Sequence, residues 1–144
     1  MRIALAEAQA AAARGEAPVG AALIDPASGD VIARAGNSPI GLADPTAHAE
    51  ILALRAGAAK IGNYRLTGLT LFVTLEPCAM CAGAISLARI GRLVFGAQDE
   101  KGGGVLHGAR VFEQPTCHWR PAVDSGLLGE ESAALLRAFF ASRR

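Results

Sequence analysis

Residues 69–81 read LTLFVTLEPCAMC, and this stretch decides the fold. Its first seven residues are almost all apolar, which predicts a short strand buried on both faces of a sheet. Pro77 suits the first turn of a helix, which we expect to continue to about Ile90. A second apolar run, residues 93–96, follows that helix. Buried strands that alternate with helices predict an α/β fold, arranged as a three-layer α/β/α sandwich.

The remainder of the chain continues this alternation. Residues 19–24 and 31–35 are predicted strands joined by the turn Asp-Pro-Ala-Ser-Gly-Asp, which makes them a hairpin. Helices are predicted for three further segments: from the start to about Gly15, from about Ala47 to Lys60, and from about Gly129 to Ser142. At 144 residues, without a repeat or linker, the chain is expected to form a single domain, residues 1–144.

Two short motifs, His48-Ala49-Glu50 and Pro77-Cys78-Ala79-Met80-Cys81, bring together residues with zinc-ligand chemistry. Cys78 and Cys81 are three apart, so they share one face of a helix, and the helix N-terminus favours their thiolates. With His48 they supply three ligands, which leaves a fourth position for water, as in catalytic rather than structural zinc sites. Glu50 is predicted to move a proton instead of binding the metal. Thr46 is expected to cap a helix that begins near Ala47, so that His48 lies in the first turn.

Each motif alone has an ordinary explanation. A CxxC pair is also found in redox pairs and in structural zinc knuckles, and a single His on a helix is often merely packed or solvated. A Glu in a first helical turn commonly interacts with the helix dipole. The combination of HxE with PCxxC, however, is the signature of zinc nucleobase deaminases.

Longer stretches resemble the bacterial tRNA-specific adenosine deaminases. They are DPTAHAEI at 44–51, NYRL at 63–66, VTLEPCAMCAGA at 73–84 and RIGRLVFGA at 89–97, together with PVGA at 18–21 and GNSPIG at 36–41. The resemblance covers nearly the whole chain. It implies the cytidine-deaminase-like fold with a five-stranded mixed sheet, one Zn²⁺ per subunit and a homodimer.

The resemblance also implies a reaction and a partner. The reaction is hydrolytic deamination of adenosine to inosine at the wobble position of a tRNA, an arginine tRNA being expected, and the partner is the tRNA anticodon arm. Asn37 is expected to contact the target nucleotide, and Asp99 the neighbouring backbone or ribose. Phe139 and Phe140 match aromatic residues of the family's last helix, although core packing explains them equally well.

Composition adds limits of its own. The net charge is only +1, which argues mildly against a large nucleic-acid footprint, and the arginines form either a phosphate-contacting strip or a solvated surface. Their positions are Arg89, Arg92, Arg110, Arg120, Arg137, Arg143 and Arg144, with Lys101 beside them. Three cysteines, two of them in a metal motif, argue against a disulfide framework and for the cytoplasm. No apolar run is long enough for a membrane span, so we expect a soluble protein with no membrane partner.

The segment from Gln98 to Pro121 is the least regular part of the chain. Its run Lys101-Gly102-Gly103-Gly104 is interpreted either as a flexible loop that closes over substrate or as a simple connector. Cys117 is expected to be an ordinary thiol. The segment departs from the commonest pattern of the family, which has a longer Gly-Ala-Ser stretch after the lysine.

Two other functions remain open at this stage. A deaminase of a free base or nucleoside, such as guanine, cytidine or adenosine, needs the same zinc chemistry but no tRNA surface. A non-enzymatic, zinc-stabilised binding module would use Glu50 or Cys117 to complete a closed metal site.

Overall fold

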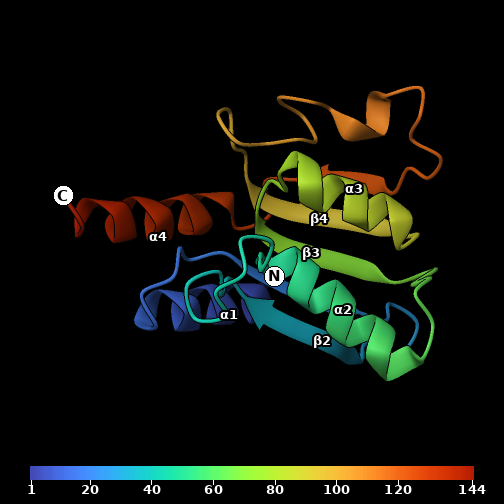
Figure 1. Ribbon diagram of the computed structural model, residues 1–144, viewed down its shortest axis with the longest axis horizontal. Helices are drawn as coiled ribbons and strands as arrows, with labels where there is room; N and C mark the ends of the chain where they lie inside the picture. Colours follow the sequence, from blue (N-terminus) through green and yellow to red (C-terminus); the bar gives the residue numbers. More distant parts are fainter.

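The computed structural model describes residues 1–144, and a five-stranded sheet runs through its centre (Figure 1). The strands are β1 (Gly20–Ile24), β2 (Val31–Gly36), β3 (Thr70–Leu75), β4 (Arg92–Ala97) and β5 (Ala122–Ser125). Their order in the sheet is β2-β1-β3-β4-β5. β1 is antiparallel to β2 and to β3, whereas β3, β4 and β5 are parallel. The predicted hairpin and the predicted mixed sheet are both confirmed.

Four helices form the two outer layers. They are α1 (Arg2–Ala13), α2 (Ala49–Ile61), α3 (Ala79–Leu87) and α4 (Gly129–Ala141), with a single 3₁₀ turn, η1, at Val111–Glu113. α2 and α3 lie side by side on one face of the sheet, and α1 and α4 pack on the other, so the predicted α/β/α sandwich is confirmed (Figure 1). No helix combines the length and apolar character needed to cross a bilayer.

The apolar residues of the central strands explain why helices cover both faces. Leu71, Val73, Leu93 and Phe95 are fully buried, as β3 and β4 require with neighbours on each side. Gly20 lets α1 approach β1 very closely, since a Cβ there would lie 1.9 Å from the carbonyl oxygen of Ala4. The sheet therefore serves as a rigid base from which loops project.

One edge of the sheet gathers the ends of three strands. Because β1 is antiparallel to both of its neighbours, β2 runs in the same direction as β3 and β4, and their carboxyl ends lie at the same edge. The segments that leave this edge are residues 37–48, 76–78 and 98–107. Open α/β sheets bind ligands at such an edge.

Two helix boundaries differ from those predicted, and one strand was not predicted. α2 begins at Ala49 rather than Ala47, and α3 ends at Leu87, three residues before Ile90, because Arg89 adopts a left-handed backbone with φ of 61°. β5 has no counterpart among the predicted segments. All four of its residues are exposed, so it lacks the apolar pattern by which strands are recognised in a sequence.

Candidate active site

The first residues of α2 and α3 meet at the carboxyl edge of the sheet. His48 is the N-cap of α2 and Cys78 the N-cap of α3, both with extended backbone, while Cys81 lies in the first turn of α3. The expectation that His48 lies within the first turn, capped by Thr46, is wrong. The N–H and the hydroxyl of Thr46 both donate to Asp44 Oδ1, at 2.8 and 2.7 Å, so Thr46 closes a turn before the helix. Pro77 likewise precedes the N-cap instead of occupying the first turn.

A residue from another element caps α2. The first N–H groups of a helix lack partners within the helix, and the N-cap side chain usually accepts from one of them. Here the N–H of Ala49 donates to Oδ1 of Asn37, at 2.8 Å, from the loop that follows β2. The imidazole of His48 is therefore free for another role, and the Nδ2 donors of Asn37 make no hydrogen bond within the chain.

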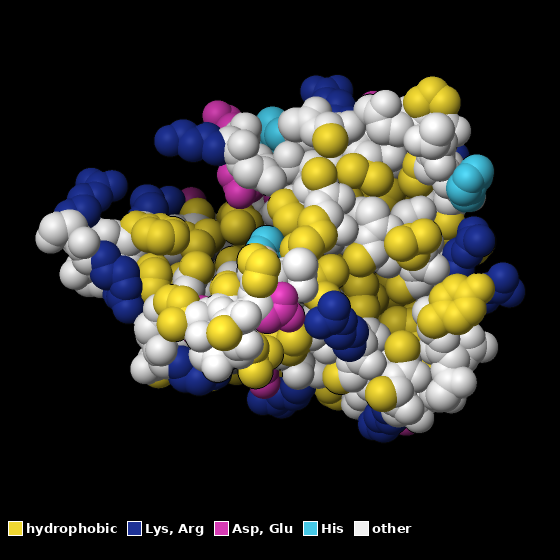
Figure 2. All heavy atoms as spheres, viewed as in Figure 1, with side chains coloured by type: hydrophobic (Ala, Val, Ile, Leu, Met, Phe, Trp, Pro, Cys, Tyr) yellow, Lys and Arg dark blue, Asp and Glu magenta, His cyan; other side chains and the backbone are white.

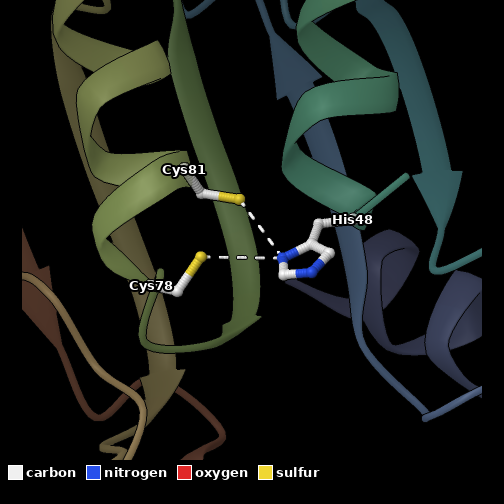
Figure 3. A group of neighbouring side chains, drawn as sticks. All are labelled: His48, Cys78 and Cys81. Atoms are coloured by element: carbon white, nitrogen blue, oxygen red, sulfur yellow. Dashed lines mark hydrogen bonds between the residues drawn. The ribbon is translucent and has the colours of Figure 1, made fainter. Parts of the chain in front are cut away.

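His48, Cys78 and Cys81 converge on one point (Figure 3). His48 Nδ1 lies 3.6 Å from each sulfur, and the three ligand atoms lie within 4.8 Å of one another. Zinc bonds of about 2.0–2.1 Å to nitrogen and about 2.3 Å to sulfur, in tetrahedral geometry, separate the two ligand atoms by about 3.6 Å. The donor set and its spacing thus fit Zn²⁺ with one coordination position left over.

The environment favours a thiolate at this cluster. A hydrogen bond from Cys81, together with the nearby His48, lowers the pKa of Cys78 to about 5. The same hydrogen bond, together with burial, raises the pKa of Cys81. Without a metal, the pair therefore shares one negative charge, and a cation that binds both sulfurs removes the second proton.

Glu50 lies beside the cluster, in the first turn of α2, but is not part of it. Its side chain is buried, with 4% of the residue exposed. Burial, together with the charge of Cys78, raises the pKa of this carboxyl to about 7. A carboxyl group with a pKa near neutrality can both accept and release a proton, which suits acid and base catalysis.

Comparison with known proteins places this geometry in a family. The model of the cytidine and deoxycytidylate deaminase zinc-binding region matches residues 1–97. The tRNA-specific adenosine deaminase of Agrobacterium fabrum is 55% identical over 144 residues, which are 100% of this chain and 93% of that protein. This chain belongs to the tRNA-specific adenosine deaminase family.

Other members of the family agree. The tRNA-specific adenosine deaminase of Haemophilus influenzae is 51% identical over 144 residues, 100% of this chain and 83% of that protein. A structure solved in a study of A-to-I editing by tRNA:A34 deaminases superposes with a TM-score of 0.92 at 55% identity. It covers 94% of this chain, which in turn covers 97% of it. The cytidine-deaminase-like fold expected from the sequence is confirmed.

The two residues expected to contact substrate follow different strands, Asn37 after β2 and Asp99 after β4. The side-chain oxygen of Asn37 accepts a hydrogen bond from the N–H of Ala49, the residue next to His48. Asp99 follows β4, and its Oδ1 accepts the N–H groups of Lys101 and Gly102 at 3.1 and 2.9 Å. Asp99 also lines a cavity of about 290 Å³ between the sheet and α4, together with Arg137 and Phe140.

Cys117 lies outside the cluster. Its sulfur contacts Ser86 Oγ at 3.5 Å and the carbonyl of Trp119 at 3.1 Å. His118 next to it is exposed. Neither side chain can complete a closed zinc site in this structure, because the metal-ligand cluster contains only His48, Cys78 and Cys81.

Sequence reasoning missed Glu76, which lies between β3 and the zinc-binding motif. Its side chain is completely buried and bonded to the loop after β4. Burial raises its pKa, but hydrogen bonds from Asp99, His107 and other N–H groups outweigh this effect, and the net pKa is lowered. The sequence did contain one indication of its importance: Glu76 is a charged residue that lies directly between an apolar strand and the uncharged motif Pro77-Cys78-Ala79-Met80-Cys81.

In the zinc-free protein, Glu50 should make the free energy of unfolding depend on pH. In the folded, zinc-free protein its pKa is about 7 against an ordinary 4.5, so between these values the folded state holds a proton that the unfolded state releases. The contribution of Glu50 to the free energy of unfolding should therefore fall by about 3 kcal/mol as pH rises through this window. Glu50→Gln should lose this contribution and keep the opposite rise that the lowered pKa of Cys78 produces. Urea denaturation of chelated protein at pH 5 and pH 8 measures it. Equal pH dependence in variant and wild type would contradict the assigned environment.

Proposed function

We propose that this protein removes the amino group of adenosine at the wobble position of a tRNA, by hydrolysis, and thereby produces inosine. The observation that carries the proposal is the three-residue metal cluster with the buried Glu50 beside it and outside it. A tRNA substrate is supported by membership of the tRNA-specific adenosine deaminase family. We infer an arginine tRNA from the same resemblance, and a cytoplasmic location from the three cysteines, two of which belong to a metal motif.

We assign the metal site to His48, Cys78 and Cys81, which would hold one Zn²⁺ through Nδ1 and two sulfurs. Bound zinc supplies a Lewis acid that lowers the pKa of a water molecule towards neutrality. Glu50 takes a proton from the attacking water and delivers it to the ring nitrogen of adenine next to C6. The water oxygen bonds to C6, and Glu50 next moves the remaining hydroxyl proton to the amino group. The C6–N bond then breaks, ammonia leaves, C6 becomes a carbonyl and Glu50 returns to its starting state.

The target base must leave its stack to reach this buried site. Extrusion costs least in a loop, where bases are already partly unstacked. Asn37 supports the proposal because its amide hydrogens are free while its oxygen is fixed by Ala49, so it can donate to the base from a defined position. Asp99 and Phe140, beside one cavity, are suited to the neighbouring ribose and base.

Only some of the cations proposed as phosphate contacts are available. Arg92 pairs with Asp124, Arg110 with Glu113 and Arg137 with Glu130, at 3.1, 3.9 and 2.7 Å. Arg120 donates to the backbone carbonyls of Phe112 and Gln114. The cations with neither a carboxylate partner nor a backbone carbonyl acceptor are Arg89, Lys101, Arg143 and Arg144. Arg143 and Arg144 follow the end of the protruding α4 (Figure 1). These four are the better candidates for contact with the tRNA backbone.

We also propose that the protein is a homodimer. Apolar side chains gather over α2 and α3 (Figure 2), where Leu87 is 76% exposed and Tyr64 66% exposed. With Ile51, Leu54, Ala58 and Ala84 they line an open groove between the two helices. An exposed apolar surface of this kind commonly marks an interface, and a second copy of the chain fits the expectation from the family.

Two substitutions separate the metal site from proton transfer. Glu50→Gln should keep zinc but lose about 10²-fold or more of the turnover rate, because an amide cannot relay a proton. Cys81→Ala should lose both zinc and stability, since metal binding contributes to folding. Zinc content by atomic absorption, thermal unfolding and inosine formation measure these effects. Cys117→Ala is the matched control and should retain zinc. Near-normal turnover in Glu50→Gln, or normal zinc in Cys81→Ala, would refute the corresponding assignment.

Substrate preference tests the tRNA target. A stem-loop with adenosine at the wobble position should react orders of magnitude faster than adenosine, cytidine or guanine, because only the stem-loop offers contacts that offset extrusion. Its affinity should fall with salt, with a log-log slope of about 0.7 per contacted phosphate. A flat salt response, with rapid turnover of a free base or nucleoside, would favour the free-base alternative instead.

A matched pair of variants isolates the Asn37 contact within that experiment. Asn37→Asp retains the oxygen that caps α2 but lacks the amide donors, whereas Asn37→Ala lacks both. Loss of stem-loop turnover in both variants, with thermal stability lowered mainly in Asn37→Ala, is expected. Normal turnover in Asn37→Asp would show that the donors contact no substrate.

The oligomeric state tests the proposed interface. Leu87→Glu places a charge at the most exposed apolar position of α3 and should shift the protein from dimer to monomer, because a buried unpaired charge is costly. Sedimentation equilibrium measures the mass directly. Leu127→Glu, at an exposed Leu outside this groove, is the control and should leave the mass unchanged. A wild-type monomer at micromolar concentration would refute the proposal.

A further inference from the structure

Among the side chains next to the active site, Glu76 makes the most hydrogen bonds, although it has no role in the proposed reaction. Its Oε1 accepts the N–H groups of Val105, Leu106 and His107 at 3.3, 2.8 and 3.0 Å. Its Oε2 accepts the N–H of Asp99 and Nδ1 of His107, both at 2.9 Å. One buried carboxylate thus satisfies four backbone N–H groups and a ring nitrogen from both ends of a single loop, residues 98–107.

The same loop is tied to the backbone next to the zinc-binding residues. The N–H of Gly104 donates to the carbonyl of Pro77 at 2.8 Å. A Cβ on Gly104 would lie 2.5 Å from the nitrogen of Ala79, and one on Gly103 would lie 2.5 Å from the Glu76 carboxyl group. Gly103 and Gly104 are buried, so the glycine run permits close packing. Of the two interpretations of this run, the flexible lid finds no support in these contacts.

The position of Glu76 links this loop to the substrate side of the site. It lies one residue after β3 and two residues before Cys78, and its N–H donates to the carbonyl of Ala97 at the end of β4, at 2.8 Å. Its carboxylate in turn accepts a hydrogen bond from the backbone N–H of Asp99. A carboxylate that many N–H groups hold in place has few alternative conformations, and the same applies to the loop that supplies those groups.

We propose that Glu76 is a positioning residue that fixes the loop 98–107, and with it Asp99, in the conformation that contacts the tRNA beside the target adenosine. The part of this inference that concerns tRNA rests on the proposed function. Glu16 holds a different loop in the same way: it accepts the N–H groups of Ile40 and Gly41, in the loop after β2, at 3.3 and 2.8 Å. It supplies a matched control because it is also buried.

Amide hydrogen exchange on the zinc-loaded, full-length protein tests the anchor without reference to activity. Glu76→Gln replaces one accepting oxygen with an amide that faces N–H donors, so at least two donors lose their acceptor. Exchange at Asp99, Leu106 and His107 should accelerate by about tenfold or more, with amides of β1 and β3 unchanged. Glu16→Gln should leave these three amides as they are in the wild type.

Kinetics on the wobble stem-loop test the link to Asp99. Per zinc-loaded enzyme, Glu76→Gln should lower kcat/KM by about 10- to 100-fold, chiefly through a higher KM. Asp99→Ala should cost much less in the Glu76→Gln background than in the wild type, because the two residues act on one contact. A residue that serves stability alone would give additive effects, or a loss that disappears after correction for active enzyme.

The outcomes are separable. Unchanged exchange at Asp99, Leu106 and His107 overturns the anchor, and additive kinetic effects overturn its connection to substrate. If Glu76→Gln does not fold, His107→Ala decides, since it removes one of the two donors to Oε2 and should accelerate exchange at Asp99 to a smaller degree. A wild-type protein that does not act on the stem-loop refutes the proposed function, while the exchange result still supports or overturns the anchor.

Discussion

The parallel pairing of β3 with β4 is the constraint on which the site depends. Val73 pairs with Phe95 and Leu75 with Ala97, so both strands end at the same level of the sheet. Glu76, the first residue after β3, and Asp99, the second residue after β4, consequently lie close together, and the N–H of Asp99 donates to Glu76. β2 ends at the same edge because β1 runs antiparallel to both of its neighbours, and the loop after β2 leads directly to His48. Side chains that are far apart in the sequence meet because β2, β3 and β4 run in the same direction.

The start of each helix next to the cluster leaves its N-cap side chain free for the proposed metal. His48 and Cys78 occupy N-cap positions, where a side chain normally accepts from the helix's own N–H groups. In α2 that role passes to Asn37, and the imidazole turns instead toward the two sulfurs (Figure 3). Asn37, which is proposed to contact the base, thus also fixes the start of α2, where the proposed ligand His48 lies. The hydrogen bond from Ala49 to Asn37 therefore affects both base recognition and the geometry of the metal site.

Two buried glutamates near the cluster show how environment sets chemistry. Glu50 is surrounded mainly by low-dielectric protein and sulfur, and burial raises its pKa to about 7. Glu76 is equally hidden, yet four backbone N–H groups and His107 stabilise its charged form, and its pKa is lowered. Desolvation and hydrogen bonding act in opposite directions on the same functional group. The first carboxyl is suited to proton transfer, whereas the second is suited to holding a loop.

The sequence alone determined the buried strands β3 and β4, the hairpin, and the residues of the metal cluster, because apolar runs and the HxE and PCxxC spacings are local patterns. It did not reveal β5, whose residues are exposed, and it misplaced the start of α2 because the acceptor that caps this helix, Asn37, comes from a different element. The sequence also did not show the role of Glu76, since its five hydrogen bonds come from four residues that lie 23 to 31 positions away along the chain. Local residue patterns specify which elements form and which side chains carry the chemistry. Only the tertiary structure decides which hydrogen bonds hold these side chains in place. Those hydrogen bonds join loops from different strands, and the loops meet because the strands run in the same direction and end at one edge of the sheet.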